Sequence, residues 1–171
     1  MSRARLQRGF TLIEAAITTV IIGVGCVSML ALLGAGTVAN NEGTELTTAM
    51  HLAGNVREAM TGVQFSDPST PTHWGPETGE GSVSAYDDLD DFDGRTFSPP
   101  IDARRASLGS NYATWGQRVT VESVNPDNLT AVIAHLTLEP ALRPVSRVTV
   151  SVLHNGKAVY SQSWLSAYAD P

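Results

Sequence analysis

The chain has 171 residues, enough for one modest domain, and it carries a formal net charge of −6. Because an acidic chain repels phosphate backbones, nucleic-acid binding is not expected. The single cysteine, Cys26, excludes an intrachain disulfide and a cysteine-based zinc motif.

A short basic segment of nine residues precedes a long apolar run. The segment contains Arg3, Arg5 and Arg8, and its removal would leave eight basic against seventeen acidic side chains, a formal net charge of −9. Residues 15–39 then contain no charge over twenty-five positions. As a helix this run would be roughly 37 Å long, which exceeds a hydrocarbon core of about 30 Å. Arginines before the run and acids after it place the N-terminus in the cytoplasm and the bulk of the chain outside.

Glu14 stands at the start of this run, where a charge needs an explanation. A charged side chain within the membrane costs roughly 2.5–3.5 kcal/mol on insertion scales. One interpretation is that Glu14 lies at the headgroup level, where the helix dipole favours it. A secretory signal peptide is another interpretation of the whole segment, but its apolar region usually covers about 7–15 residues. The longer run predicts a helix that is retained.

The residues from Arg8 to Glu14 read R-G-F-T-L-I-E. Placed between a basic leader and a membrane-length helix, they resemble the processing site of type IV prepilins and type II secretion pseudopilins. The resemblance implies that a prepilin peptidase removes residues 1–9 by cutting between Gly9 and Phe10, and that Phe10 is then methylated. It also implies that Glu14, fifth from Phe10, neutralises the Phe10 amine of a neighbouring subunit, since such pairs attract strongly at low dielectric.

Residues 10–40 are therefore predicted to form a transmembrane and assembly helix, and residues 41–61 its amphipathic continuation. Apolar side chains at helical spacing would face a sheet: Leu46, Met50, Ala53, Val56 and Met60. The opposite, polar face would carry Glu45, Thr48, Asn55 and Glu58.

Residues 62–116 are rich in glycine, proline, serine and threonine and show no period, which predicts a loop region. Trp74 within it is expected to pack onto the domain. Five carboxylates crowd one part of this loop: Asp87, Asp88, Asp90, Asp91 and Asp93.

Two interpretations of this acidic segment stay open. Bound calcium would relieve the repulsion, so the five aspartates are candidate calcium ligands, although their spacing is not that of an EF-hand. The alternative is a solvated acidic turn with Tyr86 and Phe92 packed in the core. The segment also resembles an acidic signature in minor pilins of the mannose-sensitive haemagglutinin type, and some pseudopilins carry calcium in a nearby loop.

Residues 117–171 are predicted to form an antiparallel sheet. Four segments have strand-like patterns: residues 118–124, 129–138, 147–153 and 158–165. The second is also compatible with a short helical turn. The last two flank Asn155-Gly156, the strongest two-residue hairpin signal. A long helix followed by such a sheet predicts an α+β, pilin-like fold.

Residues and resemblance together predict a structural subunit, either a minor pilin of a type IV pilus or a pseudopilin of a type II secretion pseudopilus. Many major adhesive pilins close a loop with a disulfide, which this chain cannot form. The expected partners are the prepilin peptidase and methyltransferase, other pilin or pseudopilin subunits, and the inner-membrane assembly platform. The subunit would span the inner membrane once, with its C-terminal domain in the periplasm, before entering the filament.

Two other function classes compete with this prediction. An enzyme is not expected, because the four histidines stand apart from plausible nucleophiles and the sequence lacks GxSxG, HExxH and phosphate-binding glycine motifs. The alternative is a signal-anchored periplasmic binding domain that does not polymerise.

Overall fold

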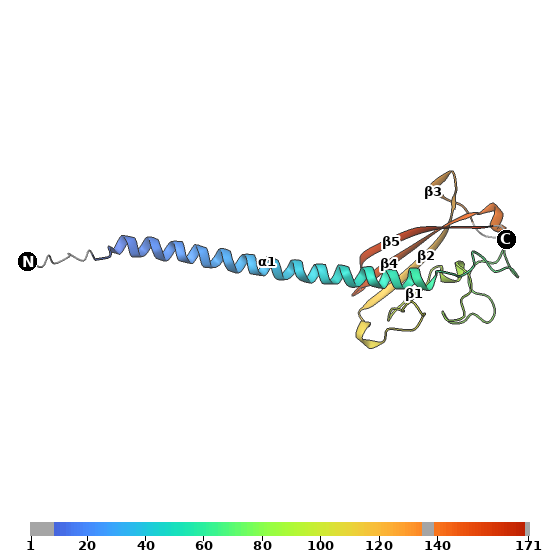
Figure 1. Ribbon diagram of the computed structural model, residues 1–171, viewed down its shortest axis with the longest axis horizontal. Coiled ribbons are helices and arrows are strands. Elements are labelled where there is room, and N and C mark those ends of the chain that lie inside the picture. Colours follow the sequence, from blue (N-terminus) through green and yellow to red (C-terminus); the bar gives the residue numbers. More distant parts are fainter. Residues whose placement is uncertain (1–8, 135–138, 170–171) are drawn as a thin grey trace, which may run out of the picture. The chain divides into compact units, whose positions relative to one another are not determined.

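The computed structural model describes residues 9–134 and 139–169 (Figure 1). The chain divides into two compact units, Met1–Thr44 and Glu45–Pro171. The helix α1 (Leu12–Ala59) contributes to both of them. Within the second unit, its C-terminal turns are followed by loops and an antiparallel sheet. The predicted α+β, pilin-like fold is confirmed.

The start of α1 is defined by a cap at Thr11. Its hydroxyl accepts a hydrogen bond from the backbone N–H of Glu14 at 3.3 Å, and its carbonyl accepts one from Ala15 at 3.1 Å. Thr11 and Glu14 thus have the spacing of a capping box, T-x-x-E, in which a glutamate at the third helical position is favoured. The T-L-I-E sequence therefore begins the helix.

Hydroxyl side chains within the apolar part of α1 donate hydrogen bonds to backbone carbonyls of the preceding turn. The Thr18 hydroxyl donates to the Glu14 carbonyl at 2.7 Å, and the Ser28 hydroxyl donates to the Val24 carbonyl at 2.9 Å. Such bonds to the preceding turn let a hydroxyl enter an apolar medium without an unsatisfied donor. The helix is long and apolar enough to cross a membrane.

The face that the C-terminal turns of α1 bury agrees only in part with the predicted one. The buried positions are Ala49, Leu52, Ala53, Val56 and Ala59. The prediction was right for Ala53, Val56 and the following Met60, but wrong for Leu46 and Met50, whose exposed fractions are 46% and 51%. The alanines let the helix backbone approach the sheet closely, and this rotates the contact face away from Leu46 and Met50.

Glu45 also departs from its predicted place on the outer, polar face. Its carboxylate oxygen lies 2.6 Å from His154 Nδ1, and the imidazole stacks on Trp115 with ring centroids 4.2 Å apart. Glu45 therefore lies on the side of α1 that meets the sheet.

The sheet has five antiparallel strands, named from their order along the chain: β1 (Thr96–Phe97), β2 (Trp115–Asn125), β3 (Asn128–Val132), β4 (Val145–His154) and β5 (Lys157–Ala167). The order across the sheet is β1-β2-β4-β5, and β3 pairs with β2. Figure 1 shows the last turns of α1 beside this sheet, and buried valines of β2 and β4 join these turns in the core.

The strand predictions are confirmed for β2, β4 and β5. Asn155 and Gly156 form the turn between β4 and β5 with φ angles of 51° and 77°, the pair of positive values that a type I′ turn requires. The uncertain segment 129–138 forms the strand β3 up to Val132, and its residues 135–138 lie outside the described residues.

Two polar side chains connect the loops to the core. Gln117 is fully buried; its Oε1 accepts the Ile101 N–H at 2.7 Å, and its Nε2 donates to the Leu52 and Ile101 carbonyls at 2.8 and 3.0 Å. The Arg105 guanidinium donates to the Ala59 carbonyl at 3.1 and 3.2 Å and so satisfies an acceptor at the C-terminus of α1. It also donates to the Tyr86 carbonyl and so connects the acidic loop to the C-terminus of α1.

Candidate functional site

The predicted processing site lies ahead of the helix in an exposed backbone segment. Gly9 and Phe10 precede α1, and the Phe10 side chain is 74% exposed. A Cβ added at Gly9 would meet no described atom within 4 Å. The described residues therefore set no steric requirement for glycine at this position.

Glu14 occupies the first turn of α1, and its side chain is exposed. Its backbone N–H is held by Thr11. Within the described residues the ion pairs are Arg147–Glu122 and His154–Glu45, so no ion pair involves the Glu14 carboxylate. The carboxylate is thus accessible to a cation from another molecule.

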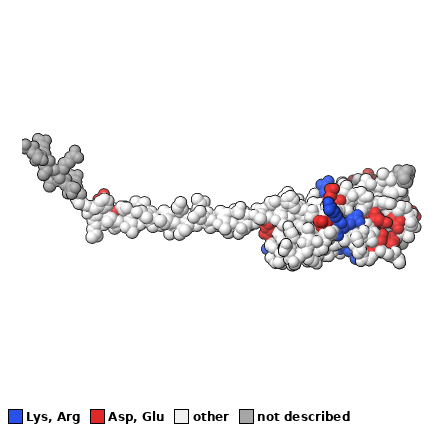
Figure 2. All heavy atoms as spheres, turned by 60° about the horizontal axis from the view of Figure 1, so that its bottom comes forward, with Lys and Arg blue, Asp and Glu red and all other residues white. Residues whose placement is uncertain are grey.

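The apolar stretch of α1 exposes large side chains on every side. Leu12 is 90% exposed, Leu32 74% and Val27 67%, and no part of its most apolar window is buried within the described structure. Figure 2 shows this stretch almost without charged atoms, whereas acidic side chains gather in a patch on the folded unit. So large an apolar surface needs lipid or other helices to cover it.

The acidic loop contradicts the solvated turn that the sequence suggested. Asp88, Asp90 and Asp91 are buried, with exposed fractions of 0 to 2%, while Asp87 is exposed. Their segment forms the 3-10 turn η1 (Asp90–Phe92). The expected burial of two aromatic neighbours is confirmed: Tyr86 and Phe92 lie in the core, in edge-to-face contact with ring centroids 5.1 Å apart.

Most of the predicted ligand carboxylates hold the backbone of the loop. Asp88 accepts the N–H groups of Asp90 and Asp91 with one oxygen and that of Asp67 with the other, at 2.7 to 3.2 Å. Asp90 accepts the Gly75 N–H at 2.9 Å. The aspartate carboxylates therefore fix the conformation of the loop by accepting hydrogen bonds from its backbone N–H groups.

Asp93 connects the acidic loop to the sheet and to Trp74. One of its oxygens accepts the Val121 N–H at 2.8 Å, and the other accepts the Trp74 indole N–H at 3.0 Å. Trp74 packs against the core, as the sequence predicted. Arg143, buried to 1% exposure, lies over the Trp74 ring with its guanidinium carbon 5.0 Å from the centroid.

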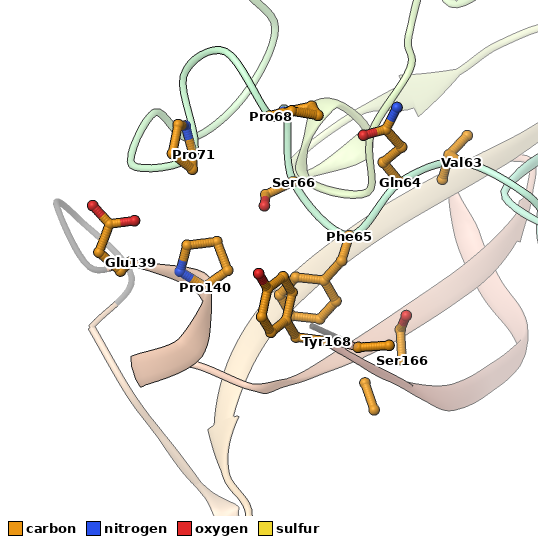
Figure 3. Close-up of a pocket in the computed structure, with 12 residues that line it drawn as sticks. Val63, Gln64, Phe65, Ser66, Pro68, Pro71, Glu139, Pro140, Ser166 and Tyr168 are labelled. Atoms are coloured by element: carbon orange, nitrogen blue, oxygen red, sulfur yellow. The ribbon is translucent and has the colours of Figure 1, made fainter. Parts of the chain in front are cut away.

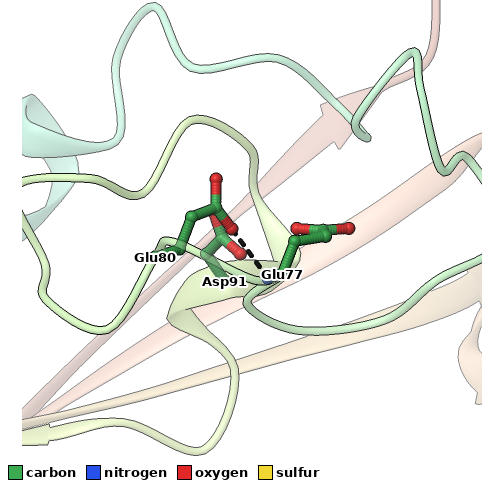
Figure 4. A group of neighbouring side chains, drawn as sticks. All are labelled: Glu77, Glu80 and Asp91. Carbon is green, nitrogen blue, oxygen red and sulfur yellow. Dashed lines mark hydrogen bonds between the residues drawn. The ribbon is translucent and has the colours of Figure 1, made fainter.

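Among the five predicted ligands, Asp91 lies close to the carboxylates of two glutamates. Oxygens of Asp91, Glu77 and Glu80 lie within 4.8 Å of one another (Figure 4). Sequence reasoning missed the two glutamates, because they lie in the irregular loop more than ten positions before Asp91. The structure does not gather the five aspartates around one point.

Burial raises the pKa values of the buried aspartates in this loop. It raises the pKa of Asp88 to about 7, with a further contribution from the Asp90 carboxylate. It raises the pKa of Asp90 to about 6, although the Gly75 N–H and the Arg143 charge oppose the shift. The pKa of Asp91 is raised as well, by burial and by the Asp88 carboxylate.

These shifts predict a stability that falls as pH rises. Between about pH 4 and 7 the folded chain holds protons that the unfolded chain has released, so ionisation opposes folding. Asp90→Asn keeps an oxygen for the Gly75 N–H and removes the ionisation. In EDTA it should raise the free energy of unfolding at pH 7 by roughly 1–3 kcal/mol and change it little at pH 4. Urea unfolding at several pH values, followed by tryptophan fluorescence, measures this difference.

The exposed Asp127 provides the control for this experiment, since Asp127→Asn removes the same charge from a solvated turn. Its unfolding curve should match the wild type at every pH. An Asp90→Asn variant with the pH dependence of the wild type would show that Asp90 is not a titrating group in this range.

An open groove of about 640 Å³ lies beside the C-terminal end of β5 (Figure 3). Phe65 and Tyr168 meet edge-to-face within it, with centroids 5.7 Å apart, and Pro68, Pro71 and Pro140 line its other side. The described residues that line it include Ser66 and Ser166.

Comparison with protein families locates one match, and it lies at the N-terminus. Residues 4–30 match the model of the prokaryotic N-terminal methylation motif, which covers the predicted cleavage site, Glu14 and the first turns of α1. No significant match was found among curated proteins or solved structures. The motif implies processing by prepilin peptidase and assembly with other pilin subunits, and it is typical of structural proteins rather than enzymes. On a helix long enough to span a membrane, the match supports a type IV pilin-like protein.

Proposed function

We propose that this chain is a minor pilin or a pseudopilin, cut between Gly9 and Phe10, methylated at Phe10 and assembled through α1. The methylation motif at residues 4–30 is the observation that carries the proposal. The exposed apolar surface of α1 supports it, because packed subunits would cover that surface with neighbouring helices.

Glu14 and the new N-terminus supply the specificity of assembly. Cleavage frees an ammonium group on Phe10, close to the membrane. The accessible Glu14 carboxylate of one subunit neutralises the Phe10 amine of the next, and the pair is strong because the surrounding medium is apolar. A misplaced subunit would leave both charges unpaired, so the pair also fixes the register between helices.

The proposed organisation follows from this role. Residues 1–9 are the leader, residues 10–40 the membrane and assembly helix, and residues 41–61 its amphipathic continuation. Residues 62–116 form the loop region with the acidic segment and also contain the short strand β1, and residues 117–171 supply most of the sheet, whose strand β2 begins at Trp115. The chain spans the inner membrane once with its N-terminus in the cytoplasm, as the leader arginines favour.

The filament is either a type IV pilus or a type II secretion pseudopilus, and its partners include the peptidase, the assembly platform and other subunits. A minor role is supported by the single cysteine, which cannot form the loop-closing disulfide of many major pilins.

Mass spectrometry of the protein purified from membranes tests the proposal. The mature chain is expected to begin with N-methylated Phe10. Gly9→Leu should retain the leader, because a side chain there obstructs the peptidase, whereas Gly43→Leu, at another open position, should be processed normally. A wild-type chain that keeps Met1 or Ser2 would instead support the alternative, a signal-anchored periplasmic binding domain.

A further inference from the structure

We propose that Glu77, Glu80 and Asp91 bind a calcium ion in the loop region of the folded unit. The site contains no residue of α1 or of the methylation motif. It shares only Asp91 with the five aspartates that the sequence suggested.

The first argument is the convergence of three carboxylates from two loop segments. One oxygen from each residue lies within 4.8 Å of the other two. Figure 4 shows the Glu80 and Asp91 carboxylates side by side, with Glu77 next to them. Calcium ligands lie about 2.3–2.6 Å from the ion, so oxygens up to about 5 Å apart can share one ion. Without a cation, the three charges would repel one another.

The second argument is a pair of buried oxygens without hydrogen bonds. Asp91 has no exposed surface; its Oδ2 accepts the N–H groups of Asp87 and Asp88, whereas its Oδ1 has no partner among the described residues. Glu77 repeats the pattern: its Oε1 accepts the Thr70 hydroxyl at 2.7 Å, and its Oε2 is buried without a described partner. A buried acceptor left unsatisfied is destabilising, and both of these belong to the same cluster. A cation would satisfy both.

The third argument is that the carboxylates are held in place before any ion arrives. The Glu77 backbone N–H donates to Glu80 Oε2 at 2.9 Å, which is the dashed line in Figure 4. Each of the three carboxylates therefore uses one oxygen to fix its orientation and can offer the other. Such orientation by surrounding hydrogen bonds is typical of metal ligands.

The ligand chemistry selects the ion. The cluster offers only carboxylate oxygens, whereas zinc and copper favour imidazole and thiolate ligands. Magnesium requires near-octahedral geometry at about 2.0–2.1 Å, but calcium accepts irregular sets of six to eight oxygens. Backbone carbonyls and water can complete such a set, so calcium is the cation that these residues fit.

Isothermal titration of the full-length chain in detergent micelles, after removal of metals with EDTA, tests the site. Calcium chloride is expected to bind with a stoichiometry near one. Glu80→Gln and Asp91→Asn should each weaken binding by about tenfold or more. The control Glu58→Gln removes a carboxylate from the exposed side of α1 and should bind calcium like the wild type.

Thermal unfolding provides a second measurement on the same proteins. Calcium should raise the midpoint of the wild type and of Glu58→Gln, because a ligand of the folded state stabilises it, but should leave that of Glu80→Gln nearly unchanged. The proposal is overturned by an absence of binding heat in the wild type, by unchanged affinity in both cluster variants, or by magnesium binding as tightly as calcium.

Discussion

Replacing Glu14 with alanine is expected to leave the protein in the membrane but to stop its incorporation into filaments. Membrane insertion depends on the apolar run, which the substitution only extends. In the proposed assembly, incorporation depends on the pair between the Glu14 carboxylate and the neighbour's Phe10 amine. Removing one partner of a buried pair costs roughly 3–5 kcal/mol. Each incorporation step should thus be weakened by about a hundredfold or more.

The structure gives Glu14 a second role, which the experiment must separate from pairing. Glu14 is at the third helical position after Thr11, where glutamate and glutamine both favour the helix start. Glu14→Gln therefore preserves the capping-box residue type while it removes the charge. If Glu14 serves the helix start, Glu14→Gln assembles normally; if it serves pairing, this variant fails like Glu14→Ala.

Two measurements on each strain decide between these outcomes. Membrane fractionation reports insertion, and immunoblotting of sheared filaments, or of cross-linked subunits in a pseudopilus, reports incorporation. Glu42→Ala is the matched control, since it removes an exposed carboxylate from the same helix outside the apolar run. Normal filament content in the Glu14→Ala strain would contradict charge pairing as the basis of assembly.

Local sequence signals predicted the parts of this fold that local interactions determine. Asn155-Gly156 specifies a turn with two positive φ angles, and the alternating valines of β4 before it fix which face of that strand is buried. The membrane-length helix is likewise specified by consecutive apolar residues. These features need no information about distant parts of the chain.

The buried face of α1 depended on distant residues, and there the prediction was partly wrong. Leu46 and Met50 fit a helical stripe as well as Ala49 and Leu52 do, so periodicity alone could not choose between the faces. Which face of the helix is buried depends on the side chains that the sheet places against it. His154, more than a hundred positions away, takes Glu45 as its partner on the contact side.

The candidate sites also differ in whether consecutive residues or distant residues form them. Gly9, Phe10 and Glu14 are recognisable because the methylation motif is a short continuous segment. The cluster of Glu77, Glu80 and Asp91 is not recognisable in the sequence, because the two glutamates approach Asp91 only after the loop has folded. A count of aspartates directed attention to this loop, but most of the counted carboxylates accept hydrogen bonds from backbone amides.

Gln117→Leu is expected to cause a large loss of stability, by about 2–4 kcal/mol, although leucine fits the apolar pattern of the strand better. Gln117 follows the inward alternation of Val119 and Val121 on β2. Its amide satisfies both the N–H and the carbonyl of Ile101 and also reaches the Leu52 carbonyl of α1. Leucine would leave the two Ile101 groups buried without these partners, and each unsatisfied group costs roughly 1–3 kcal/mol.

Urea unfolding followed by tryptophan fluorescence measures this loss, because all three tryptophans lie in the second unit. Gln162→Leu is the matched control: the same substitution on β5, at a half-buried position opposite Val150. It should change the free energy of unfolding little. If Gln117→Leu were as stable as this control, apolar burial alone would hold β2 against α1 and the loop. A lower stability would instead show that the hydrogen bonds of one buried amide are needed to join helix, loop and sheet.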